Sequence, residues 1–188
     1  MVKLWTRQHI NSLDELNKNG VIRIERKHLI EKFDEISDYI INLYSWFVNE
    51  ADKKVSKPYD VEFPIWCSIS DENMLRPTMN EVVYVIEVND EDIIYFDGAK
   101  WDYVLNHHYV PIDENDEKEY AEDLMKKGFT NSFLFLDDKK SHLYPEEKKR
   151  VIDSWHRIFD IDSWDIFRVQ ANIWEIKPEM IKDILYYN

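Results

Sequence analysis

The segment from Phe167 to Glu175 constrains the fold more than any other part of the chain, because its side chains alternate in polarity. The apolar positions are Val169, Ala171 and Ile173, and the polar ones between them are Arg168, Gln170 and Asn172. This alternation is typical of a β-strand with one face on a core and the other on a cleft or water. The opening segment from Leu4 to Gln8 also predicts a strand with polar groups on one face. We therefore expect a cleft lined from both ends of the chain.

Between these segments the pattern alternates between helix and strand. The apolar, β-branched run from Val82 to Val88 predicts a buried strand, and residues 93–96 predict another strand after the acidic turn at Asn89–Asp92. Ser12 and Glu15 form a capping-box pattern at a helix start, and apolar residues at helical spacing predict one long helix from Ile30 to Asp52. We expect one α+β domain over residues 1–188, with a mixed, twisted sheet flanked by helices.

Charge argues against broad binding to nucleic acid. The net charge is −14, whereas nucleic-acid binders usually carry a basic surface or stripe. The basic runs Lys53–Lys54 and Lys148–Arg150 are interpreted as solvated helix surface. The acidic runs Asp90–Asp92 and Asp137–Asp138 are interpreted as ordinary solvating carboxylates.

The single cysteine, Cys67, excludes a disulfide within the chain and fits a reducing compartment. The first residues contain no apolar stretch typical of a signal peptide, and no apolar run is long enough to span a bilayer. We expect a cytoplasmic protein without a membrane partner.

The usual signatures of metal and phosphate sites are missing from the sequence. It has no HExxH or CxxC pattern, and only His107 and His108 are adjacent among its histidines. It has no GxGxxG, Walker or GxSxG pattern. We therefore expect no metal cofactor, and no Rossmann or P-loop enzyme.

Several single residues remain candidates for ligand contact. Asp97 follows a buried strand and precedes Gly98, which suits either a functional carboxylate or, more simply, the cap of the helix that carries Trp101. Trp5, Trp66 and Trp101 lie on or beside predicted strands and offer rings for stacking or for the core. Trp5 is followed by Thr6, Arg7 and Gln8, which bring hydrogen-bond donors beside its ring, and the Arg7 guanidinium suits pyrophosphate or a carboxylate.

Five segments together resemble an uncharacterised bacterial family, domain-of-unknown-function family 3841. They are LWTRQ, FPIWCS, the block from VVYVIEV through IIYFD to WDYVLN, SWHRIFD and VQANIWEIKPEMI. The resemblance covers nearly the whole chain. Membership of this family implies no known activity.

The chain also resembles the ADP-ribosyltransferase fold, through an opening strand with a polar triplet, a central aromatic strand and a late strand that runs into a Pro-Glu-x-Ile turn. In that superfamily the first strand supplies His or Arg, a middle strand supplies Tyr or Ser, and the last supplies Glu. The resemblance assigns the first place to Thr6 or Arg7, the second to Trp66 or Ser68, and the third to Gln170.

The resemblance implies that NAD, or another nucleotide, is the ligand and a possible substrate. Gln170 and Thr6 would then orient the ribose, Trp5 or Trp66 would stack on a ring, and Arg7 would hold the pyrophosphate. Gln170 departs from the family glutamate, and a neutral amide stabilises a developing oxocarbenium ion less than a carboxylate does. Binding without turnover, or an acidic interaction protein that is no enzyme, is the alternative. The acceptor macromolecule is not specified by these residues.

Overall fold

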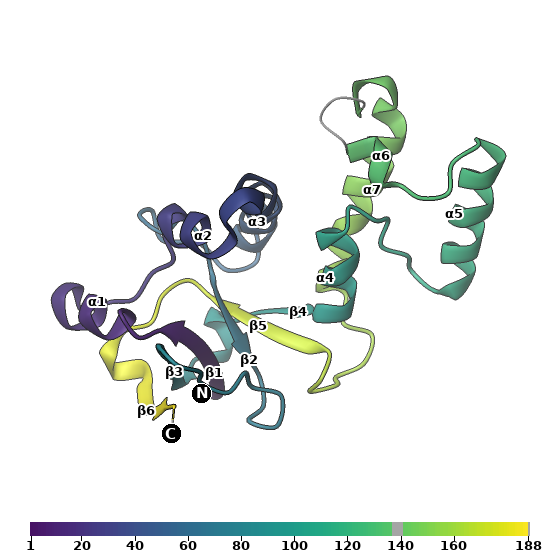
Figure 1. Ribbon diagram of the computed structural model, residues 1–188. Helices are drawn as coiled ribbons and strands as arrows, with labels where there is room; N and C mark the ends of the chain where they lie inside the picture. The colour runs from purple at the N-terminus through teal and green to yellow at the C-terminus, as the bar shows by residue number, and fades with distance from the viewer. Residues whose placement is uncertain (137–140, 188) are drawn as a thin grey trace. The chain divides into compact units, whose positions relative to one another are not determined.

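The computed structural model describes residues 1–136 and 141–187 (Figure 1). Contacts within the chain divide it into two compact units, Met1–Tyr95 with Trp164–Asn188, and Phe96–Ser163. The acidic pair Asp137–Asp138 lies outside the described residues. The expectation of a single domain over residues 1–188 stays a prediction.

Six strands form one sheet in the order β4-β5-β2-β1-β3-β6 (Figure 1). Their bounds are β1 Val2–His9, β2 Ile65–Ser68, β3 Glu81–Val88, β4 Ile94–Asp97, β5 Val169–Ile173 and β6 Ile181–Tyr186. The α+β class and the helices that flank the sheet are confirmed. The strand predicted to close the chain is β5, and β2 separates it from β1.

The sheet is antiparallel where a mixed sheet was expected. The pairs β1/β2, β1/β3, β2/β5 and β3/β6 all run antiparallel. Long connections between strands often produce parallel neighbours. Here β1 lies between β2 and β3 and runs against both, so those two parallel strands are never adjacent.

One face of the sheet carries a hydrophobic core. Leu4, Cys67, Tyr84 and Ile86 are buried there, and Leu13 and Leu16 of helix α1, Ser12–Asn19, pack against it. The expected capping box does not form. Asn11 is the N-cap without a side-chain cap bond, and the Ser12 hydroxyl instead makes a 2.8 Å hydrogen bond with the buried Tyr84 hydroxyl.

The long helix expected from Ile30 to Asp52 is two helices. Helix α2 covers Arg26–Phe33, a 3-10 turn η1 covers Asp34–Ile36, and helix α3 covers Ser37–Asp52. The break comes at Asp34, whose φ of 45° lies in a region that few residues other than glycine adopt. The apolar stripe continues through the break, so the hydrophobic spacing alone could not reveal it.

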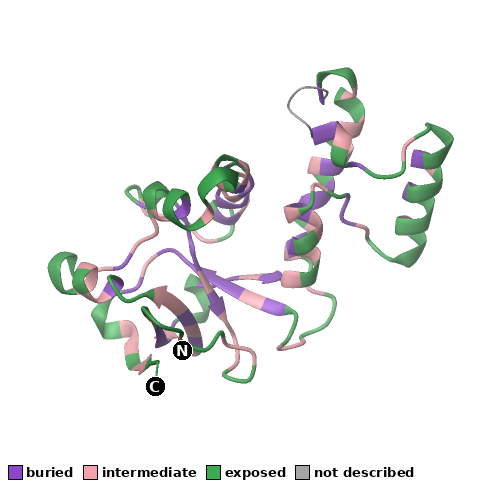
Figure 2. Ribbon diagram, in the orientation of Figure 1, coloured by how far each residue is buried: buried purple, intermediate pink, exposed green. Residues whose placement is uncertain are grey.

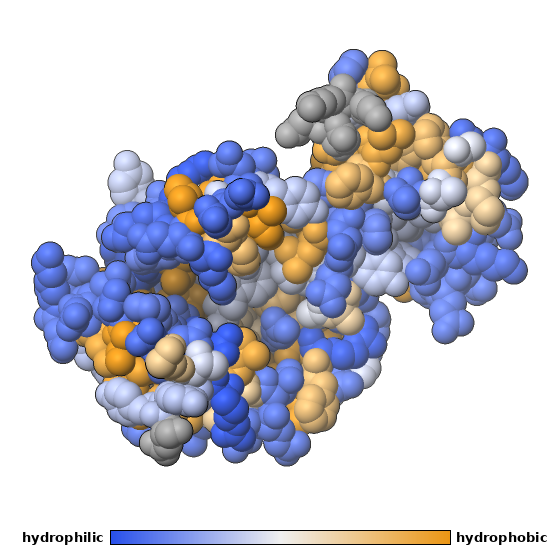
Figure 3. All heavy atoms as spheres, viewed as in Figure 1, coloured by the Kyte–Doolittle hydropathy of each residue, from blue (hydrophilic) through white to orange (hydrophobic). Residues whose placement is uncertain are grey.

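The remaining part of the first unit contains the 3-10 helices η2, Asp90–Asp92, and η5, Pro178–Met180. β5 is mostly buried, whereas buried and partly exposed residues alternate along β2 (Figure 2). The visible surface over α1 is largely hydrophilic (Figure 3), in keeping with the charge of −14.

The second unit is helical. Its elements are α4 Gly98–Leu105, α5 Glu114–Lys126, α6 Phe133–Leu136, η3 Ser141–Leu143, α7 Pro145–Ser154 and η4 Trp155–Phe159. Pro145 opens α7 in the first turn, where a missing backbone N–H costs no hydrogen bond.

Candidate functional site

Three predicted site residues form a row across the neighbouring strands β1, β2 and β5. Trp5 pairs with Ser68, and Ser68 pairs with Gln170. Directly paired residues of antiparallel strands project from the same face of a sheet. Arg7 projects from that face too, because it follows Trp5 by two positions on β1. The row Trp5, Ser68 and Gln170, together with Arg7, is called the polar row below.

All four side chains of the polar row are partly exposed. The Arg7 Nε lies 3.3 Å from Glu81 Oε2, and Arg7 Nη1 donates to the Arg76 carbonyl at 3.3 Å. The Ser68 hydroxyl donates to the Asn73 carbonyl at 3.2 Å. Within residues 1–136 and 141–187, the Gln170 amide and the Trp5 indole N–H have no hydrogen-bond partner. The row therefore offers a ring, a cation and an uncommitted amide.

Thr6 and Gln8 lie on the opposite face, since neighbouring side chains on a strand alternate. Thr6 is only 2% exposed, and its hydroxyl donates to the Trp66 carbonyl at 2.8 Å. The Gln8 amide donates to the Thr6 hydroxyl, also at 2.8 Å. The structure therefore does not bring Thr6 together with Gln170, and gives Thr6 a structural environment.

Trp66 shares the face of the polar row but is covered by helix α3. Its ring centroid lies 5.1 Å from those of both Tyr44 and Phe47. Its partner across the strands, Asn172, is fully buried and donates through Nδ2 to the Ile65 carbonyl at 3.3 Å. The packing of this ring against α3 is that of a core residue.

Asp97 and Trp101 belong to the second unit. The Asp97 carboxylate accepts hydrogen bonds from the backbone N–H groups of Ala99 and Lys100 at 2.9 and 3.1 Å, and so caps helix α4. Capping was the simpler of the two interpretations of this residue. Trp101 is 5% exposed on the same helix.

Sequence reasoning missed Glu81 and Asn73, which surround the polar row. Glu81 precedes the apolar run of β3 and pairs with Arg7, while Asn73 Nδ2 donates to the Ile166 carbonyl at 3.1 Å. Both lie in or next to a polar loop, where nothing in the sequence distinguishes them from solvated residues.

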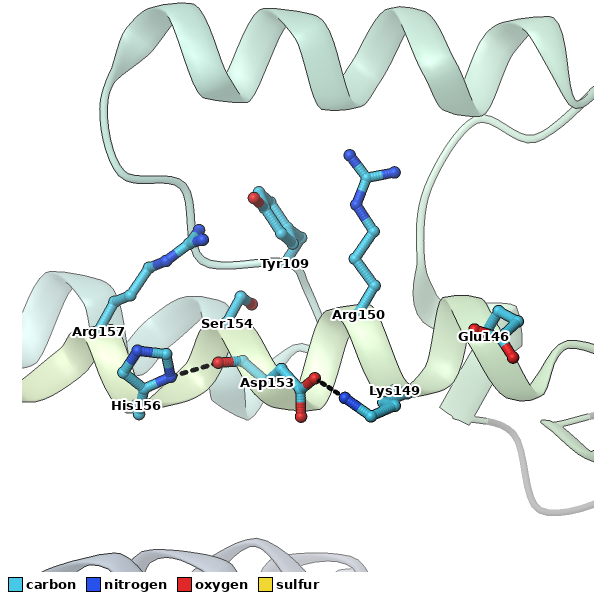
Figure 4. Close-up of a pocket in the computed structure, with 8 residues that line it drawn as sticks. All are labelled: Tyr109, Glu146, Lys149, Arg150, Asp153, Ser154, His156 and Arg157. Atoms are coloured by element: carbon cyan, nitrogen blue, oxygen red, sulfur yellow. Dashed lines mark hydrogen bonds and ion pairs between the residues drawn. The ribbon is translucent and has the colours of Figure 1, made fainter.

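A surface depression of about 460 Å³ lies in the second unit (Figure 4). Arg150 and Arg157 extend from α7 and η4 on the same side as Tyr109, and their guanidinium carbons lie 5.7 and 5.0 Å from its ring centroid. Tyr109 in turn stacks on Tyr120 at 4.0 Å. Both guanidinium groups therefore lie within cation–π distance of the Tyr109 ring.

Carboxylates already neutralise the cations of this depression. Arg157 lies 3.2 Å from Asp116, and Arg150 lies 2.6 Å from Asp123. Lys149 pairs with Asp153, as the dashed line in Figure 4 marks. Burial raises the pKa of Tyr120 to about 12, so its phenol stays protonated. We interpret the depression as an ion-pair network that holds α5 against α7.

The described part of the chain contains neither a cluster of metal-ligating residues nor a membrane-spanning helix. No cluster of three or more His, Cys, Asp or Glu residues in residues 1–136 and 141–187 is arranged to hold a metal ion. Over the same residues, no helix combines the length and the apolar composition needed to cross a bilayer.

The sheet and its polar row define an α+β protein with a half-exposed polar face on an antiparallel sheet. The family described as Domain of unknown function (DUF3841) matches residues 3–182, and the chain belongs to it. No curated protein and no solved structure matches the chain.

Proposed function

We propose that the polar row binds NAD or a closely related nucleotide, in a site of the ADP-ribosyltransferase type. Arg7, Ser68 and Gln170 take the first-, middle- and last-strand roles in this proposal. The supporting observation is that these three side chains project from three adjacent strands on one face. Arg7 rather than Thr6 takes the first-strand role, because the Thr6 hydroxyl is buried on the opposite face.

The dimensions of the row suit the ribose and pyrophosphate of such a ligand. Adjacent strands lie about 4.8 Å apart, so Gln170 and Trp5 are about 10 Å apart across the sheet. Two residues along β1 add about 7 Å between Trp5 and Arg7. Arg7 holds the pyrophosphate through its guanidinium fork, and the Trp5 ring stacks on a flat base. The Ser68 hydroxyl and Gln170 amide bond to the ribose.

The proposed reaction is cleavage of the bond between the ribose C1′ and the nicotinamide nitrogen. Water, or an acceptor nucleophile, attacks C1′, the bonding electrons leave with nicotinamide, and the nucleophile loses its proton to solvent. Gln170 orients the ribose but carries no negative charge to stabilise the oxocarbenium-like transition state. We therefore expect the site to bind NAD but to cleave it slowly.

The second candidate is an interaction protein without catalysis. Trp164 and Phe167, next to β5, are each 61% exposed, and large exposed aromatic side chains are favoured in protein interfaces. Under this candidate, the polar row is solvated surface and nucleotides do not bind.

Thermal unfolding with ligand distinguishes the two candidates. The panel is NAD, ADP-ribose, nicotinamide and an unrelated nucleotide, each with wild type and Gln170→Ala. A ligand a hundredfold above its Kd stabilises the folded state by about 2.7 kcal/mol. We expect a rise in Tm with NAD and ADP-ribose that Gln170→Ala removes. No rise at millimolar ligand would refute nucleotide binding.

Gln170→Glu tests the catalytic part separately. It restores the carboxylate that the transferase site uses, so nicotinamide release from NAD should be faster than with wild type. If NAD binds both proteins but neither releases nicotinamide, the site binds without catalysing.

A further inference from the structure

The connection between β2 and β3 crosses the sheet over β1. β2 and β3 flank β1 and both run antiparallel to it, so they run parallel to each other. Loop 69–80 must therefore return across one face of β1 to begin β3. The hydrogen bond from Arg7 to the Arg76 carbonyl identifies that face as the one with the polar row.

Side-chain hydrogen bonds hold loop 69–80 at three places. Near its start, Asn73 Nδ2 donates to the Ile166 carbonyl at 3.1 Å, and the Asn73 carbonyl accepts from the Ser68 hydroxyl at 3.2 Å. In its middle, Arg7 Nη1 donates to the Arg76 carbonyl at 3.3 Å. At its end, the Thr78 hydroxyl donates to Glu81, the same carboxylate that pairs with Arg7.

Apolar burial holds this loop only at its start, where Ile69 packs against the core. Leu75 is 61% exposed and Met79 is 75% exposed. A segment with few buried apolar contacts opens at low free energy, so its hydrogen bonds decide how often it leaves the sheet. Asn73 and Arg7 are therefore latches whose loss should open the loop.

We propose that loop 69–80 gates the polar row, with the Asn73–Ile166 and Arg7–Arg76 hydrogen bonds as its latches. This inference rests on the proposed nucleotide site. Arg7 belongs to both the latch and the site, and an ionised phosphate is a stronger acceptor for a guanidinium than a backbone carbonyl is. The nucleotide binds the open form and replaces the Arg76 carbonyl on Arg7. By linkage, a ligand that binds only the open form also increases its population.

The test removes the latch that lies outside the ligand site. Asn73→Ala deletes one side-chain hydrogen bond of the loop. Asn89→Ala is the matched control, because Asn89 Nδ2 donates to Asp92 at 3.2 Å in the exposed β3–β4 turn. The Ile10 and Glu81 amides donate to the Asn80 and Thr78 carbonyls of the loop at 2.8 and 3.0 Å, so their hydrogen exchange measures opening. Stopped-flow association with ADP-ribose measures access to the row.

Loss of one such hydrogen bond corresponds to about a fivefold change in the open population. We expect Asn73→Ala to speed both exchange of the Ile10 and Glu81 amides and ADP-ribose association about fivefold, with Asn89→Ala matching wild type. ADP-ribose itself should speed exchange of these amides in wild type.

Each other result overturns the inference in a recognisable way. Unchanged loop exchange in Asn73→Ala shows that Asn73 is no latch. If Asn73→Ala exchanges faster but binds ADP-ribose at the wild-type association rate, the loop opens without controlling access to the site. Absence of ADP-ribose binding in all three proteins refutes the proposed function and the gating role with it.

Discussion

Replacing Thr6 by valine should destabilise the protein through the loss of two partly buried hydrogen bonds. The Thr6 hydroxyl donates to the Trp66 carbonyl and accepts from the Gln8 amide, both at 2.8 Å, with Thr6 only 2% exposed. Valine preserves the branched shape but can make neither hydrogen bond. At about 1 kcal/mol for each bond, the loss is about 2 kcal/mol.

Thermal and urea unfolding of wild type, Thr6→Val and Gln170→Ala measure this effect. For a chain of this size, about 2 kcal/mol lowers Tm by about 4–8 °C. Gln170→Ala should change stability by no more than about 0.5 kcal/mol, since no described residue bonds to its amide. Equal destabilisation by both variants, or none by Thr6→Val, would refute the assignment of the two residues to structural and exposed faces.

Three further predictions concern buried and charged groups. Ser12→Ala should lower the free energy of unfolding in urea by about 1–3 kcal/mol, because it leaves the Tyr84 hydroxyl unpaired. The double variant Ser12→Ala with Tyr84→Phe should lose less than the sum of the two single variants, and additive losses would contradict the hydrogen bond between the two hydroxyls. Burial opposes ionisation of Glu175, but hydrogen bonds and charges from Lys177 and Arg23 hold its pKa below the usual 4.5. The stabilisation from the Glu175 carboxylate is therefore present above that pH and is lost as pH falls through the folded pKa. Glu175→Gln should flatten the dependence of the free energy of unfolding on pH in this acidic range, and an unchanged slope would exclude this role. Burial raises the pKa of the Cys67 thiol to about 12. A thiol reagent at about pH 8 should therefore label Cys67 only as fast as the protein opens, and immediate labelling of the folded protein would contradict the burial of this residue.

Sequence periodicity predicted the elements whose environment repeats along the chain. Alternation identified β5 and placed Gln170 and Asn172 on one face. The continuous apolar run of β3 marked a strand buried on both sides. These patterns report burial residue by residue, so the strands could be found without any knowledge of their partners.

Pairing and loop geometry could not be predicted in the same way. The division of β1 into two faces was visible in principle, yet only the Trp5–Ser68 register shows that Arg7 rather than Thr6 shares a face with Gln170. The break at Asp34 involves neither glycine nor proline, and therefore left no local signal. The crossing of loop 69–80 follows from the position of β1 between β2 and β3, a long-range property that residue types do not encode locally.

The most direct test of the polar row compares neighbouring residues of β1 that project from opposite faces. Calorimetric titration with ADP-ribose is carried out on wild type, Arg7→Gln and Thr6→Val under conditions where each is folded. A charged hydrogen bond to the ligand is worth about 1.5–3 kcal/mol, and loss of the Arg76 latch favours the open form about fivefold. Arg7→Gln should therefore weaken binding about 2- to 30-fold, while Thr6→Val retains the wild-type Kd. Wild-type affinity in Arg7→Gln, or loss of binding confined to folded Thr6→Val, would contradict a site on this face.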